Sequence, residues 1–121
     1  MAKIIIIEDA LLMRKMLRNL IIEAGHEVVG EAEDGYLGIH EYLNQKPDLI
    51  LLDIIMPKMD GIKTLKTLIG HNPKIKIIIV SSIESMKMIK YAIRCGAKGY
   101  VMKPFHGPML IKEINKVLAL S

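Results

Sequence analysis

The stretch KIIIIED, residues 3–9, decides the fold, because four successive isoleucines run directly into Glu8 and Asp9. A second run of the same kind, Leu49 to Leu52, ends at Asp53. Strands that are apolar on both faces are typical of a parallel sheet covered by helices on each side, and such sheets bind ligands at the carboxyl ends of their strands. We therefore expect the three carboxylates to share one crevice at that edge.

Carboxylates held this close together raise one another's pKa unless a cation lies among them. A ligand set made only of oxygen atoms suits a hard divalent ion, here Mg²⁺ or Mn²⁺. Glu8, Asp9 and Asp53 are therefore the candidate metal ligands.

The composition is that of one domain, residues 1–121, in a cytoplasmic protein. Its 121 residues suffice for a single hydrophobic core. The one cysteine, Cys95, excludes an intramolecular disulfide and fits a reducing compartment. The first apolar run is too short for a signal peptide, and the others are too short for a membrane span, so we expect no membrane insertion.

The balance of charge is mildly basic, with 17 Lys and Arg against 13 Asp and Glu. The basic residues are spread over several predicted helices without an interleaved aromatic patch, so no direct nucleic-acid partner is expected. Arg14, Lys15 and Arg18 do cluster on the first predicted helix, and we interpret them as a solvated face.

Apolar periodicity predicts five β/α units and hence a doubly wound parallel sheet. The strand-like runs are residues 3–8, 27–32, 49–53, 75–81 and 99–102, with a helix after each. Gly25 is expected to follow the end of the first helix, Asp60 to cap the third, and Gly70 to end it. Gly38 lies inside the second helix, where it costs about 1 kcal/mol relative to Ala.

Ser81 and Lys103 end two further strand-like runs, so four of the five strand ends carry a functional group. With these residues in view, the sequence resembles the receiver domains of two-component response regulators over essentially its whole length. The matching motifs are Glu8-Asp9, LLDIIMP at residues 51–57, MDG at 59–61, Ser81-Ser82, Gly96-Ala97 and GYVMKPF at 99–105. This resemblance implies a flavodoxin-like (βα)5 fold with strand order 2-1-3-4-5.

The resemblance also implies a function and a partner. Asp53 would accept a phosphoryl group from a sensor histidine kinase or a phosphotransfer protein, and the domain would catalyse only its own phosphorylation and dephosphorylation. Asp9, Asp53 and the backbone carbonyl of Ile55 would hold Mg²⁺ directly, and Glu8 through water. Lys103 and Ser81 would bind the phosphoryl oxygens.

A switch and an output surface are implied in the same way. Phosphorylation would draw Ser81 inward, reshape the segment 82–85 and let Tyr100 turn inward, exposing a surface on the fourth helix, fifth strand and fifth helix to a phosphorylation-dependent protein target. We assign Met88, Tyr91 and Cys95 to that surface, although they also fit a widened core stripe beside Met86, Ile89 and Ile93. The family pattern also implies a cis peptide bond at Lys103-Pro104.

Ile55 and Ile83 stand two residues after Asp53 and Ser81, where receivers tune the attacking water. Two apolar side chains cannot orient water, so slow autodephosphorylation is expected.

The alternatives are an enzyme with a separate substrate, a scaffold, or a different kind of regulator. A haloacid-dehalogenase-type phosphatase needs a second Asp where Ile55 stands, and a flavodoxin needs a phosphate loop where Ala10, Leu11 and Leu12 stand. A degenerate receiver is disfavoured by the complete set of site residues. The chain is interpreted as a stand-alone regulator of the chemotaxis type, the alternative being a receiver module from a longer transcriptional or enzymatic regulator.

Overall fold

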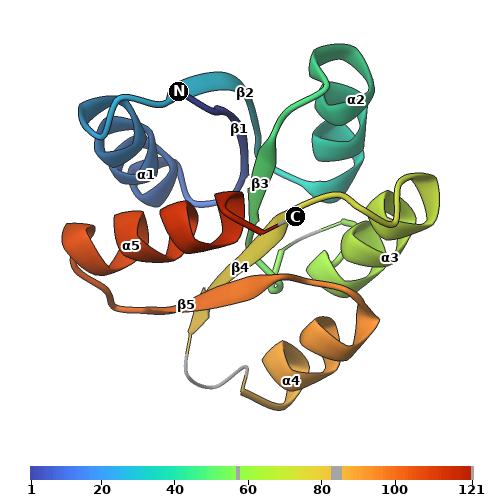
Figure 1. The fold of residues 1–121 in the computed structure, drawn as a ribbon. Helices are drawn as coiled ribbons and strands as arrows, with labels where there is room; N and C mark the ends of the chain where they lie inside the picture. The colour runs from blue at the N-terminus through green and yellow to red at the C-terminus, as the bar shows by residue number, and fades with distance from the viewer. Residues whose placement is uncertain (57, 83–85, 121) are drawn as a thin grey trace.

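The computed structural model describes residues 1–56, 58–82 and 86–120, and these form five β/α units in succession (Figure 1). The strands are β1 (Lys3–Ile7), β2 (Glu27–Ala32), β3 (Leu49–Leu52), β4 (Ile77–Ser82) and β5 (Gly99–Lys103). The helices are α1 (Leu11–Glu23), α2 (Gly35–Gln45), α3 (Gly61–His71), α4 (Met86–Cys95) and α5 (Gly107–Leu118).

The sheet is parallel throughout, and its strand order is β2-β1-β3-β4-β5. Helices α1 and α5 cover one face, and α2, α3 and α4 cover the other (Figure 1). The predicted doubly wound, flavodoxin-like fold with strand order 2-1-3-4-5 is confirmed. Strands β1, β3, β4 and β5 are consecutive neighbours, so their carboxyl ends form one continuous edge.

The isoleucine run of β1 is explained by two separate cores. Ile5 and Ile7 belong to the layer under α2, α3 and α4, whereas Ile4 and Ile6 belong to the layer under α1 and α5. Because successive strand residues point to opposite faces, a strand covered on both sides must be apolar at every position.

Several predicted helix boundaries are confirmed and one is wrong. Gly25 follows α1 with a φ of 89°, and the Asp60 carboxylate caps α3 by accepting a hydrogen bond from the Lys63 amide at 2.8 Å. Helix α3 does not end at Gly70: it continues through His71, and Asn72 is the C-terminal cap.

Two burial patterns also differ from the sequence prediction. Ile93 does not join a core stripe on α4, because it is 39% exposed and the buried residues of that helix are Ile89 and Ala92. Arg14 is not fully solvated, since its guanidinium donates to the Glu8 carbonyl at 2.8 Å and pairs with Glu31 at 3.4 Å.

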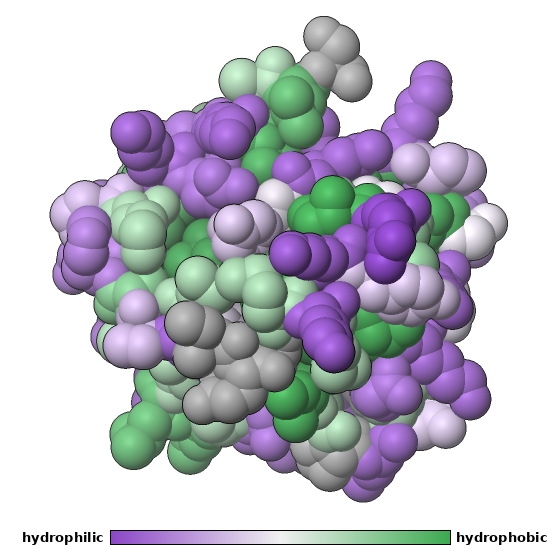
Figure 2. All heavy atoms as spheres, turned by 90° about the horizontal axis from the view of Figure 1, so that it is seen from below, coloured by the Kyte–Doolittle hydropathy of each residue, from purple (hydrophilic) through white to green (hydrophobic). Residues whose placement is uncertain are grey.

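Hydrophobic and hydrophilic side chains are interleaved on the face seen from below (Figure 2). Within the described part of the chain, no helix combines the length and apolar character that a membrane crossing requires.

Candidate functional site

The site lies at the carboxyl edge of the sheet, where four neighbouring strands end. Glu8 and Asp9 follow β1, and Asp53 follows β3. Ser81 is the last residue but one of β4, and Lys103 is the last residue of β5. Glu8, Asp53 and Ser81 are buried. All five predicted side chains therefore meet at one edge, as the topology requires.

Asp53 is surrounded by hydrogen-bond donors from three directions. Its Oδ1 atom accepts from the Ile55 amide at 3.2 Å and from the Ser81 hydroxyl at 3.4 Å. Its Oδ2 atom lies 3.5 Å from the Lys103 ammonium. The carboxylate is thus held in one orientation while the residue remains 6% exposed.

Lys103 forms its shortest bond with Glu8, not with Asp53. The distance from Lys103 Nζ to Glu8 Oε1 is 2.7 Å, and the other Glu8 oxygen accepts from the Ala10 amide at 3.0 Å. The predicted cis peptide bond at Lys103-Pro104 is confirmed. The lysine thus bridges the ends of β5, β1 and β3.

Burial raises the pKa of both buried acids. Desolvation raises the pKa of Glu8 to about 6, against the lowering effects of the Lys103 and Ala10 hydrogen bonds. Desolvation likewise raises the pKa of Asp53, opposed mainly by the Lys103 charge. Burial alone would lower the pKa of Lys103. The hydrogen bond to Glu8 and the charge of Asp53 outweigh that effect, so the pKa of Lys103 is raised.

Glu8, Asp9 and Asp53 fit a divalent cation. Each offers a carboxylate oxygen, and these oxygens lie within 4.8 Å of one another. An all-oxygen set with two buried acids of raised pKa and one exposed acid is chemically suited to Mg²⁺, whose charge would offset the desolvation of the buried pair.

Two supporting residues were not predicted from the sequence. The Arg14 bond to the Glu8 carbonyl ties α1 to the end of β1. The Gly61 amide donates to the Ile54 carbonyl at 2.7 Å, and a Cβ atom at Gly61 would collide with the Asp53 and Ile54 backbone. Both contacts span a loop between a strand and the helix that follows it, where the chain has no regular period, so the sequence pattern did not reveal them.

The other predicted residues lie around this centre. Ile55 is exposed beside Asp53, whereas Ile83 lies outside the described residues, as do residues 84 and 85 of the proposed switch segment. Tyr100 is 44% exposed on β5, and Met88 and Tyr91 are exposed on α4. Cys95 packs against the core, and this favours the core interpretation for that one residue.

The fold and the strand-end cluster can now be compared with known proteins. The family model of the response regulator receiver domain matches residues 4–115 of this chain. The chain belongs to this family. The receiver resemblance predicted from the sequence is confirmed, and receivers act in signalling and are not metabolic enzymes.

Several relatives match nearly the whole receiver. Chemotaxis protein CheY of Thermotoga maritima is 39% identical over 115 residues, which cover 95% of this chain and 96% of that protein. Chemotaxis protein CheY of Bacillus subtilis is 39% identical over 116 residues, covering 96% and 97%. DegU of Brevibacillus brevis, a transcriptional regulatory protein, is 31% identical, and the match spans 49% of its length.

Solved structures agree with the receiver fold. The receiver domain of NtrX from Brucella abortus superposes with a TM-score of 0.92 at 25% identity, covering 98% of this chain and 99% of that one. The response regulator domain of Thermotoga maritima CheB superposes with a TM-score of 0.87 at 28% identity, covering 98% and 97%.

Proposed function

We propose that this receiver is a phosphoacceptor switch in which Asp53 takes a phosphoryl group from a sensor histidine kinase or phosphotransfer protein. The observation that carries the proposal is the environment of Asp53: a buried carboxylate at a strand end, oriented by Ile55, Ser81 and Lys103. No substrate pocket is needed, because the receiver itself is the acceptor.

The transfer requires a carboxylate nucleophile and neutralisation of charge. An Asp53 oxygen attacks the phosphorus of the donor phosphohistidine, the P–N bond breaks, and the imidazole leaves with the bonding electron pair and is protonated. Lys103 and Ser81 lie within 3.5 Å of the carboxylate, so both are in reach of an attached phosphoryl group.

Mg²⁺, when bound by Asp9, Asp53, the Ile55 carbonyl and, through water, Glu8, would neutralise negative charge on the phosphoryl oxygens. The chain's own contribution is to hold the carboxylates in place. Glu8 is fixed by the Ala10 amide, and Asp53 by the Ile55 amide.

Switching requires several new contacts at once. Moving a two-state domain from mostly inactive to mostly active takes about 5.5 kcal/mol of differential binding. One hydrogen bond to a charged group contributes about 1.5–3 kcal/mol, so Ser81, Lys103 and the loop amides after Asp53 must act together. Ser81 and Tyr100 form the proposed path to an output surface on α4, β5 and α5, which includes Met88 and Tyr91.

The proposed setting is a cytoplasmic, chemotaxis-type single receiver with a phosphorylation-dependent protein target. The identity to CheY proteins over nearly their full length supports it. The DegU match, which spans about half of that regulator, supports the alternative of a receiver module from a longer protein.

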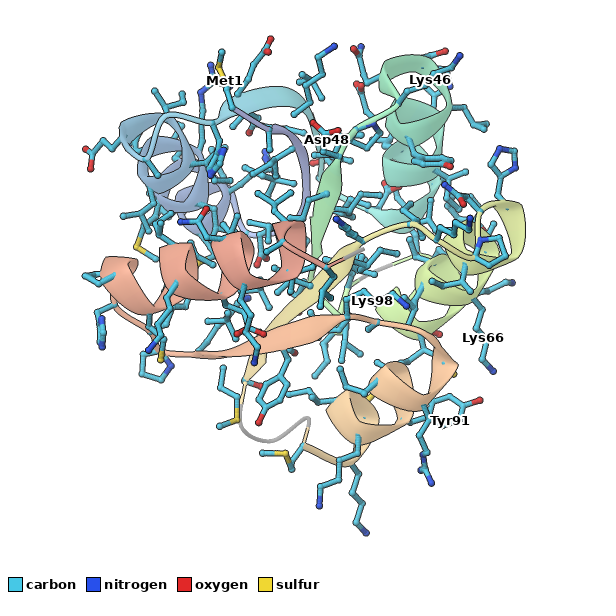
Figure 3. All side chains as sticks on the ribbon, in the orientation of Figure 1. Met1, Lys46, Asp48, Lys66, Tyr91 and Lys98 are labelled. Atoms are coloured by element: carbon cyan, nitrogen blue, oxygen red, sulfur yellow. The ribbon has the colours of Figure 1, made fainter. Side chains whose placement is uncertain are left out.

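The decisive experiment is intact mass spectrometry after incubation with acetyl phosphate, with Mg²⁺ or with EDTA. The wild type should gain one phosphoryl group only with Mg²⁺, and Asp53→Asn should gain none. Asp48→Asn is the matched control, because Asp48 precedes β3 at the opposite edge of the sheet (Figure 3) and should leave the gain unchanged. An equal gain in Asp53→Asn, or no gain in the wild type, would refute Asp53 as the acceptor.

The switch path has its own test. The phosphoryl mimic beryllium fluoride should bury the Tyr100 ring, observed as protection of its NMR signals from a soluble paramagnetic probe. The exposed ring of Tyr36 on α2 is the internal control and should not change. If Tyr100 stays exposed with the mimic bound, the proposed path is wrong.

A further inference from the structure

Positive charge is concentrated in one part of this chain. Residues 58–98 contain nine Lys and Arg against two Asp and Glu, whereas the remaining residues contain eight against eleven. Helices α3 and α4 both lie in the basic part, and neither contains an acidic residue. The mild net charge of the whole chain therefore hides one strongly basic segment, which includes both of these helices.

A groove of about 540 Å³ runs between these two helices. Its apolar lining is Ile62 from α3 with Met88 and Tyr91 from α4, and its basic lining is Lys63, Lys66 and Lys87. The one carboxylate there, Asp60, already accepts the Lys63 amide as the cap of α3. The groove thus combines an apolar surface with three cations.

The lysines of the groove are available to a partner. None of Lys63, Lys66 and Lys87 pairs with a carboxylate among the described residues, and all three side chains are exposed. Lys66 Nζ lies 4.9 Å from the centroid of the Tyr91 ring, so the two helices already touch at the outer rim (Figure 3). A carboxylate placed there would add charge pairing to an existing cation–π contact.

We propose that the α3–α4 groove binds an acidic segment of a protein partner, with an apolar side chain against Ile62, Met88 and Tyr91 and carboxylates on the three lysines. Charge complementarity selects the sign of the partner. The recessed apolar lining selects a partner with an apolar side chain that projects into the groove, and an amphipathic peptide has such a side chain. A lipid surface would instead be met by protruding apolar groups, and a nucleic acid would need an open stacking face on Tyr91, which Lys66 covers.

The inference deepens the proposed function, because Met88 and Tyr91 belong to the output surface named there, but it needs no phosphorylation. A different groove on the other side of α4 is lined by Met86, Ile93 and Tyr100, the proposed switch residue. The α3–α4 groove does not include Tyr100. Binding in it is therefore expected for the unphosphorylated protein.

The test is selection of a phage-displayed library of random 12-residue peptides on the full chain, followed by synthesis of the enriched peptides. Selected peptides should be rich in Asp and Glu with an apolar residue among them. When a selected peptide is added, the backbone amide chemical shifts of the protein in ¹⁵N spectra should change most in α3 and α4. Binding should weaken at least tenfold in Lys63→Glu/Lys66→Glu/Lys87→Glu, and should weaken with added salt.

Lys15→Glu/Lys112→Glu/Lys116→Glu is the matched control, because it changes the net charge equally at exposed positions on α1 and α5. It should keep wild-type affinity, and far-UV circular dichroism should show both triple variants folded. Equal losses in the two variants, enrichment of non-acidic peptides, or shifts centred beside Tyr100 would overturn the proposal. The proposal would also be overturned if a single-stranded DNA oligonucleotide or phosphatidylglycerol vesicles displaced the bound peptide at a concentration below that of the peptide.

Asp53→Asn separates this inference from the proposed function. Peptide binding to that variant should equal binding to the wild type. If the wild type fails to gain a phosphoryl group but still binds acidic peptides through the groove, only the phosphoacceptor proposal fails. If it is phosphorylated but selects no acidic peptide, only the groove proposal fails.

Discussion

Glu8 should make the stability of the metal-free protein fall as pH rises through about 6. Its side chain is 2% exposed, and burial raises its pKa from 4.5 to about 6. The folded protein therefore holds the Glu8 proton more tightly than the unfolded chain does. The stabilisation is fully present below pH 4.5 and is lost as the pH rises through 6. A change of this size in one pKa corresponds to about 2 kcal/mol of unfolding free energy.

The perturbation is Glu8→Gln, which keeps the shape of the side chain and removes its titration. Urea denaturation of both proteins in EDTA, at intervals from pH 4.5 to 7.5, gives the difference in unfolding free energy at each pH. Groups that do not interact with Glu8 titrate alike in both proteins and cancel from this difference, whereas Asp53, whose pKa depends partly on Glu8, contributes to it. We expect the wild type to lose about 2 kcal/mol relative to the variant across the range, most of it between pH 4.5 and 6.

The matched control is Glu23→Gln, which removes an exposed carboxylate at the end of α1. The unfolding free energy of this variant should differ from that of the wild type by the same amount at every pH. Repeating the series in millimolar Mg²⁺ should flatten the Glu8 difference, because a bound cation keeps the carboxylate ionised at lower pH. A difference that is flat across the pH range in EDTA would refute the assignment of the desolvated acid to Glu8.

Three further perturbations test the packing, a helix cap and the chemistry. Gly38→Ala should lower the free energy of unfolding by about 1 kcal/mol, because the added Cβ meets the Ile7 side chain. In urea denaturation, the double variant Gly38→Ala/Ile7→Val should lose less than the sum of the two single variants. Additive losses would refute the contact. Asp60→Ala should cost about 1 kcal/mol by uncapping α3, whereas Asp60→Asn should cost little, and equal losses measured in urea would contradict the cap. Ile55→Asn should shorten the lifetime of the phosphoryl group on Asp53, because an amide can orient the attacking water, and an unchanged decay of the phosphorylated mass would show that Ile55 does not limit hydrolysis.

The strand ends could be predicted because two constraints act on the same residues. Strands buried on both faces must be apolar throughout, so a Glu or Asp can appear only where the strand stops. Parallel topology then brings those stops to one edge, which is why the meeting of Glu8, Asp53 and Lys103 follows from sequence alone. That Lys103 lies closer to Glu8 than to Asp53 depends on side-chain reach, which no spacing encodes.

Most of what the sequence did not predict depends on contacts between elements. Gly38 looked like a weak point of α2, but an added Cβ there would meet Ile7, so the residue permits close packing of α2 on β1. Gly70 has open space around it and did not end α3. Periodicity showed that Met88 and Tyr91 share a stripe, but only the packing of α4 beside α3 shows which neighbour that stripe faces.

The bond between Lys103 and Glu8 means that the site supplies its own counter-ion. A lysine ammonium already sits against a buried carboxylate at 2.7 Å, so the cluster is partly neutralised before any ligand arrives. Lys103 also lies 3.5 Å from Asp53, and its ammonium has three donors, so an anion attached to Asp53 would compete with Glu8 for the same positive charge. The charge balance of Glu8 is therefore linked through one lysine to whatever group Asp53 carries.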